Sequence, residues 1–187
     1  MKTKQLSIVL IMIFLIGSAY GSFAQRRVVN TPRRTVVQGP RGTVVYRKAP
    51  PVVKPVRRLP AKAAVVHYHS RPYYYHGGVF YVARNGSYVR VVPPVGIRVA
   101  VLPAGYVRLV VGPSVFFYAG GIFYVEDVSS GEYVVADPPV GAIVSQLPSG
   151  AAEVEIDGKL YYEYNGILYK PVRTEKKAYE VAGKLED

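Results

Sequence analysis

The sequence repeats one pattern of strand-forming residues at intervals of 43 to 45 residues. Three similar segments, YYYHGGVFY, FFYAGGIFY and YYEYNGILY, occupy residues 73–81, 116–124 and 161–169. Between them, residues 86–105 and 131–150 align with each other without a gap. A repeat of this length indicates one supersecondary unit that is used several times to build a shared core.

Glycine pairs inside the repeat predict β-hairpins. Asn165–Gly166 is a strong two-residue turn signal, because a type I′ turn needs a positive φ at both central residues. Gly77–Gly78 and Gly120–Gly121 occupy the equivalent places. The PPVG segments at 93–96 and 138–141 cannot lie inside a central ladder, because proline lacks an amide donor, so they mark sheet corners or edges.

These signals together predict an all-β fold. We expect about ten short antiparallel strands over residues 73–172, from two and a half repeats of roughly 45 residues. The expected architecture is a small sandwich or an SH3-like barrel, and both one body and two lobes in series fit the pattern. Within the tail, residues 173–187, apolar residues at helical spacing predict one short helix over residues 174–185. The residues at that spacing are Ala178, Val181, Ala182 and Leu185.

The sequence predicts one strand register for the hairpin at Asn165–Gly166 and leaves two registers open for the hairpin at Asp157–Gly158. Across Asn165–Gly166, Tyr164 lies opposite Ile167. At Asp157–Gly158, a two-residue loop would pair Ile156 with Lys159. A three-residue loop would instead pair Glu155 with Lys159, which matches opposite charges, and we prefer it.

The N-terminal residues are typical of an exported protein. Two lysines precede an apolar run over residues 6–16, and Ser22-Phe23-Ala24 offers a small-residue cleavage site, so residues 1–24 are expected to be a signal peptide. An uncleaved anchor is the alternative, but this run is shorter than the roughly 17 to 25 residues that cross a bilayer. The chain has no cysteine and so no disulfide framework. We expect a bacterial protein of the periplasm, the outer-membrane surface or the extracellular space.

Residues 25–72 form a basic arm. They carry twelve Lys and Arg residues and no acid, with repeated proline and paired valines. Such a segment cannot bury enough apolar surface to offset its ordering entropy, so we expect a disordered tether. The remainder is close to neutral, but its arginines cluster early and its acids late, so the two full repeats carry opposite charge.

LPxG blocks stand at residues 102–105 (LPAG) and 147–150 (LPSG). The hairpin, PPVG and LPxG blocks together resemble a family of bacterial exported proteins that is known only as a domain of unknown function. The resemblance covers residues 73–172, whereas the arm carries no comparable motif. Basic, Pro-rich or His-rich leaders are similar to those of that family. The resemblance implies no activity, cofactor or catalytic residue.

Catalytic and metal sites are poorly supported by the residues themselves. His67, His69 and His76 are weak metal-ligand candidates, because they lie close in the sequence, but flexible-junction positions explain them equally well. The serines lie on strands or in and beside turns without a repeated partner. Carboxylate-pair hydrolysis would need two acids from the later part of the chain. The acids considered are Glu126, Asp127, Glu132, Asp137, Glu153, Glu155, Asp157 and Glu163. We expect no catalytic residue, no cofactor and no enzymatic activity.

Aromatic side chains are the expected functional surface, because seventeen Tyr and six Phe supply amphipathic rings. We expect a non-enzymatic envelope or secreted module that binds a protein or glycan partner through a Tyr-rich sheet. The alternatives are polyanion binding by the arm, with lipopolysaccharide, anionic glycan or nucleic acid as ligand, and a carboxylate-dependent envelope hydrolase or accessory protein. The candidate partner-binding residues are Tyr73, Tyr75, Tyr118, Tyr161, Arg26, Arg27, Arg33, Arg34, Arg57 and Arg58.

Overall fold

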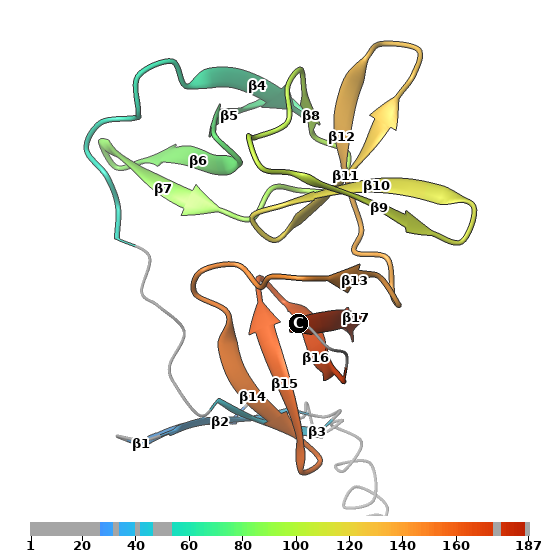
Figure 1. Ribbon diagram of the computed structural model, residues 1–187. Helices are drawn as coiled ribbons and strands as arrows, with labels where there is room; N and C mark the ends of the chain where they lie inside the picture. Colours follow the sequence, from blue (N-terminus) through green and yellow to red (C-terminus); the bar gives the residue numbers. More distant parts are fainter. Residues whose placement is uncertain (1–26, 32–33, 40–41, 47–53, 174–176, 186–187) are drawn as a thin grey trace, which may run out of the picture.

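The computed structural model describes residues 27–31, 34–39, 42–46, 54–173 and 177–185 (Figure 1). Among these residues every named element is a β-strand, and none forms an apolar helix of the length that crosses a membrane. The all-β prediction is confirmed. The strands form three open antiparallel sheets, instead of the single small sandwich or SH3-like barrel that we expected.

Three four-stranded units follow one another along the chain, in green, yellow and orange in Figure 1. The first unit contains β4 (Ala64–Tyr68), β5 (Arg71–His76), β6 (Val79–Arg84) and β7 (Ser87–Val91). The second contains β9 (Val107–Val111), β10 (Ser114–Ala119), β11 (Ile122–Asp127) and β12 (Glu132–Ala136). The third contains β14 (Ala152–Ile156), β15 (Lys159–Tyr164), β16 (Ile167–Val172) and β17 (Ala178–Lys184).

Short strands join consecutive units. β8 (Arg98–Val99) pairs with β12, and β13 (Ile143–Val144) pairs with β17, so each linker adds an edge strand to the next unit. The first unit has an equivalent edge contact, because Val56 in the segment before it forms a β-bridge with Tyr88 of β7. The described residues therefore contain three complete units, where the sequence predicted two and a half.

Residues 54–72 were wrongly assigned to the arm, because residues 54–62 form the first linker and residues 64–72 belong to β4, its turn and the start of β5. KPVRRLPAK repeats the LPxG block of the later linkers, and Lys62 takes the place of its glycine. Lys62 has a φ of 66°, and the corresponding Gly105 has a φ of 79°. The motif was missed because four basic residues and a non-glycine turn residue obscure it.

The basic arm also forms strands where the structure describes it. β1 (Arg27–Thr31), β2 (Arg34–Gly39) and β3 (Gly42–Tyr46) make an antiparallel ribbon. β3 pairs with β14, which extends the third sheet to eight strands. The expectation of a disordered arm is wrong for these residues, because the valine-rich segments find a partner edge whose strand carries Glu153 and Glu155.

The predicted C-terminal helix is wrong as well. Residues 174–176 lie outside the described part, and Ala178–Lys184 form β17. The residues also fit a strand, since Tyr179 and Val181 alternate onto one face and pack in the core. Pairing with both β16 and β13 overrides the helical spacing.

Two core clusters make the units one body. The first joins Phe80 of the first unit to Phe117 and Tyr124 of the second. The second joins Tyr118 and Phe123 of the second unit to buried residues of the third. Because neighbouring strand residues point to opposite faces, the middle sheet is covered on both sides.

Candidate functional site

An aromatic pair recurs at the same place in all three units. In each unit a ring on the second strand meets a ring on the fourth strand edge to face, with centroids 5.1, 5.3 and 5.4 Å apart and interplanar angles of 80°, 81° and 83°. These pairs are Tyr74–Tyr88, Phe117–Tyr133 and Tyr162–Tyr179. We call the sheet face that carries the pair the receiving face of its unit.

A third aromatic residue on the receiving face distinguishes the first unit. Tyr124 and Tyr169 are both 0% exposed, because the preceding unit covers them. The equivalent Tyr81 is partly exposed, and so is its neighbour Val79, although the corresponding Ile122 is buried. In the described part of the chain, the receiving face of the first unit is thus the one whose central tyrosine stays partly exposed.

The hairpin that covers the next unit carries a repeated aromatic pair of its own. Tyr75 packs on Phe80 at 4.8 Å and Tyr118 packs on Phe123 at 4.9 Å, with interplanar angles of 42° and 44°. The Tyr75 hydroxyl donates a hydrogen bond to the Val101 carbonyl at 3.1 Å, and Tyr118 donates to Gln146 at 3.5 Å. Each hairpin is therefore fixed to the linker that follows it.

Two phenol groups lie close together in the interior at each junction. The hydroxyls of Tyr124 and Tyr169 are buried without a hydrogen bond of good geometry, close to Tyr75 and Tyr118 respectively. Burial raises the pKa of Tyr118 to about 12 and raises the pKa of Tyr124 and Tyr169 far above the usual value. Burial also raises the pKa of Tyr75.

Because burial raises the pKa of these phenols, we expect the folded chain to lose stability in alkali. Their neutral form is favoured in the folded chain, so their contribution is complete below the unfolded pKa of about 10 and decreases as the pH rises towards and through about 12. We expect the absorbance of buried tyrosinates to appear together with the loss of β-sheet circular dichroism in a pH titration. A reversible rise in tyrosinate absorbance that accounts for every tyrosine, before any loss of the β-sheet circular dichroism signal, would contradict this expectation.

The structure places the predicted aromatic residues mainly in the interior. Tyr73 and Tyr75 pack against the first core cluster, and Tyr118 belongs to the second. Tyr161 is partly exposed on β15, opposite Val154. Tyr74, Tyr81 and Tyr88 were not among the predicted residues, although the repeat offset of 43 residues relates Tyr81 to Tyr124 in the sequence.

Of the predicted arginines, the structure describes the side chains of Arg57 and Arg58, which are exposed within residues 54–62. Arg27 and Arg34 begin β1 and β2, whereas Arg26 and Arg33 lie outside the described residues.

The histidines separate. His67 and His76 line one groove beside β4, whereas His69 stacks on Tyr68 with centroids 4.3 Å apart. In the described part of the chain no group of three His, Cys, Asp or Glu side chains is placed to hold a metal ion.

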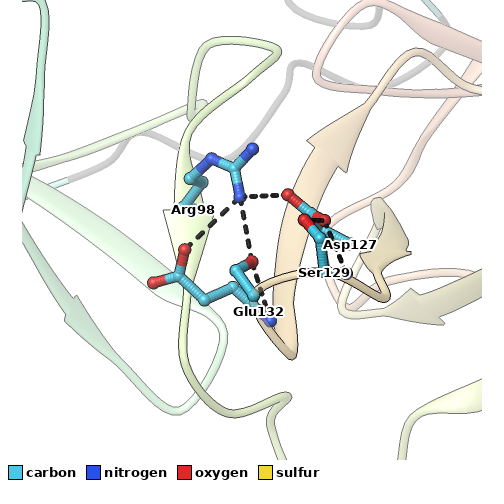
Figure 2. Close-up of polar contacts among 5 residues, drawn as sticks. Arg98, Asp127, Ser129 and Glu132 are labelled. Atoms are coloured by element: carbon cyan, nitrogen blue, oxygen red, sulfur yellow. Dashed lines mark hydrogen bonds and ion pairs between the residues drawn. The ribbon is translucent and has the colours of Figure 1, made fainter.

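Two of the predicted carboxylates are bound by Arg98 (Figure 2). The guanidinium lies 2.7 Å from Asp127 and 3.4 Å from Glu132. Hydrogen bonds from Ser129 and Arg98 hold the pKa of Asp127 well below its usual range. A general acid needs a raised pKa, so this arrangement suits a structural ion pair better than hydrolysis.

A family model matches residues 44–184, and it describes a family of unknown function, DUF6515. The chain belongs to this family. The match extends beyond residues 73–172 at both ends, and it includes the first linker and β17. No curated protein and no solved structure matches the chain.

Proposed function

We propose that this protein is an exported, non-enzymatic module of the bacterial cell envelope that binds a partner protein on the receiving face of its first unit. The observation that carries the proposal is the exposure of Tyr81, whose counterparts Tyr124 and Tyr169 are fully covered. A face with this composition gains free energy when a partner removes it from water.

The two covered copies of the face indicate what such a partner presents. Each receives a β-hairpin whose tyrosine and phenylalanine rings pack together, as Tyr118 and Phe123 do. We therefore favour a protein hairpin with a similar aromatic pair over a glycan. A second copy of this chain is a poor donor, because its own pairs are buried at the junctions and the third unit has Glu163 and Leu168 at those positions.

Charge favours an acidic partner. Residues 54–125 contain nine Lys and Arg residues and no acid. Arg90 lies opposite Tyr81 in the sheet and is exposed, and its guanidinium donates a hydrogen bond to the Tyr164 hydroxyl at 2.8 Å. Complementary charge around an apolar contact increases the association rate and the specificity.

The proposal can be tested with a cyclised peptide of residues 114–127, which contains the natural donor hairpin and two acids. We expect the mature chain to bind it, and Tyr81→Ser to weaken binding at least about tenfold. Tyr161→Ser on β15 is the matched control and is expected to bind like the wild type. Calorimetry measures the affinity, and hydrogen exchange locates the peptide on β5 to β7.

Parallel assays distinguish the other ligand classes. The same variants are mixed with purified envelope polysaccharide and sedimented, and a chain lacking residues 25–46 is included. Equal peptide binding by the wild type and Tyr81→Ser would reject the proposal. Sedimentation lost only in Tyr81→Ser would assign the face to a glycan, and sedimentation lost only without the arm would favour polyanion binding, which weakens steeply with salt.

A further inference from the structure

The first strand of every unit is an outer strand among the four strands of that unit. In the described part of the chain β4 and β9 are the terminal strands of their sheets. The equivalent β14 is not terminal, because β3 of the arm pairs with it in antiparallel register, with Glu155 opposite Val45. The repeat therefore contains one filled and two open copies of the same strand-acceptor edge.

Turn geometry fixes which backbone groups point to the open edge. His69 and Ser70 both have positive φ, so β4 and β5 are joined by a two-residue turn that Tyr68 and Arg71 close as a hydrogen-bonded pair. Because bonded and non-bonded pairs alternate in an antiparallel ladder, the N–H and C=O groups of Val65 and His67 point away from β5. The same argument applied to β14 gives Glu153 and Glu155.

A groove runs along this edge of β4. One wall is formed by β4 itself and the other by residues 98–104 of the linker. Its polar lining includes Lys62, His67, His76, Arg98 and Glu132. Val65, which is 54% exposed, adds an apolar contact in the middle of the strand.

The basic lining is not a requirement of the scaffold. At the second junction the positions of Lys62, His67, His76 and Arg98 are taken by uncharged residues on the same strands and turns. These residues are Gly105, Val110, Ala119 and Ile143 respectively. Because the second junction forms the same β-structure without these cationic and imidazole groups, their presence at the first junction points to a ligand.

We propose that the groove along β4 binds an extended acidic peptide as an added antiparallel β-strand. The filled edge on β14 supplies the backbone template, since it accepts β3, whose five residues carry no charge. On β4 the groove is lined by Lys62 and two imidazoles, and its acid, Glu132, is bound by Arg98, so the strand that fits has acidic side chains. Backbone hydrogen bonds to Val65 and His67 provide affinity, and the charged lining selects the sequence.

Arg98 has a supporting role in this arrangement. Its guanidinium is already bound by Asp127 and Glu132, which hold the β8 wall against β11 and β12 (Figure 2). Lys62 and the imidazoles of His67 and His76 are therefore the groups that meet the acids of the peptide. The site is the edge of the first sheet, and it does not depend on the receiving face.

The test uses two synthetic peptides, an acidic one that repeats the Ala-Glu-Val-Glu-Ile sequence of β14 and one with lysine at each glutamate. Each carries an added tryptophan, whose fluorescence is not obscured because the chain has none. We expect the mature chain to bind the acidic peptide at least about tenfold more tightly than the lysine peptide. Hydrogen exchange is expected to show new protection at residues 64–68.

Four variants locate the binding. Val65→Pro removes an outward N–H without breaking the ladder to β5, and is expected to weaken binding at least about tenfold. Val110→Pro on β9 is the matched control, and Tyr81→Ser separates this site from the receiving face; both are expected to bind normally. A chain with Lys62→Gly, His67→Val and His76→Ala carries the residues of the second junction, so it is expected to fold and to lose the preference for the acidic peptide.

Several results would overturn the proposal. They are equal binding of the two peptides, unchanged binding by the triple variant, and protection at β9 or β14 in place of β4. If circular dichroism shows that Val65→Pro does not fold, the triple variant and the exchange data decide the question.

Discussion

Replacing Tyr169 with alanine is expected to lower the free energy of unfolding by about 4 kcal/mol, the usual loss for a large ring truncated inside a packed core. Tyr169 is 0% exposed and lies in the cluster that joins the second and third units. Tyr169→Phe is expected to be neutral or slightly stabilising, because the hydroxyl is buried without a well-formed hydrogen bond. Urea unfolding followed by circular dichroism measures both changes.

Tyr81→Ala is the matched control, because Tyr81 occupies the same position of the first unit and is partly exposed. Its expected cost is about 1 kcal/mol, since less contact is lost where no unit covers the ring. Equal losses at Tyr81 and Tyr169 would mean that the first receiving face is covered like the others. That result would also remove the basis of the proposed function.

Local turn chemistry explains why much of the fold could be predicted. Both residues of Gly77–Gly78, Gly120–Gly121 and Asn165–Gly166 have positive φ, and the strands beside them pair as expected. Tyr164 lies opposite Ile167. These turns depend on two residues each, so the sequence is sufficient to specify them.

The preferred register of the hairpin between β14 and β15 is wrong, again because two residues set the turn. Ile156 pairs with Lys159 across a two-residue turn, and Asp157 and Gly158 have φ values of 50° and 73°. The charge match between Glu155 and Lys159 is too weak to set the register. An exposed ion pair contributes less than about 1 kcal/mol, whereas a type I′ turn matches the twist of both strands.

The binding surfaces were harder to predict, because they depend on which face of each sheet the next unit covers. Tyr73 and Tyr75 were predicted to bind a partner because the repeat is rich in tyrosine, yet both pack against the first core cluster. Strand alternation shows that Tyr74 and Tyr81 share the opposite face, but it does not show which face is covered. The acceptor edge of β4 was missed because the arm was expected to have no strands.

Gly121→Ala is expected to lower the free energy of unfolding by roughly 3 kcal/mol. Gly121 has a φ of +91°, and a Cβ there would lie 2.5 Å from the Tyr164 ring and 2.7 Å from Pro148. The left-handed conformation costs an alanine about 1–2 kcal/mol, and the overpacking adds a similar amount. The tip of the hairpin between β10 and β11 thus contacts both the third unit, through Tyr164, and the linker before it, through Pro148.

Gly120→Ala provides the control for backbone strain alone. Gly120 has a φ of +59°, and a Cβ there would meet nothing within 4 Å, so we expect a loss of about 1 kcal/mol. Urea unfolding of both variants gives the difference that belongs to the contact with Tyr164 and Pro148. If the two losses are equal, Gly121 is needed only for its turn, and the close approach of the third unit to this hairpin does not contribute to stability.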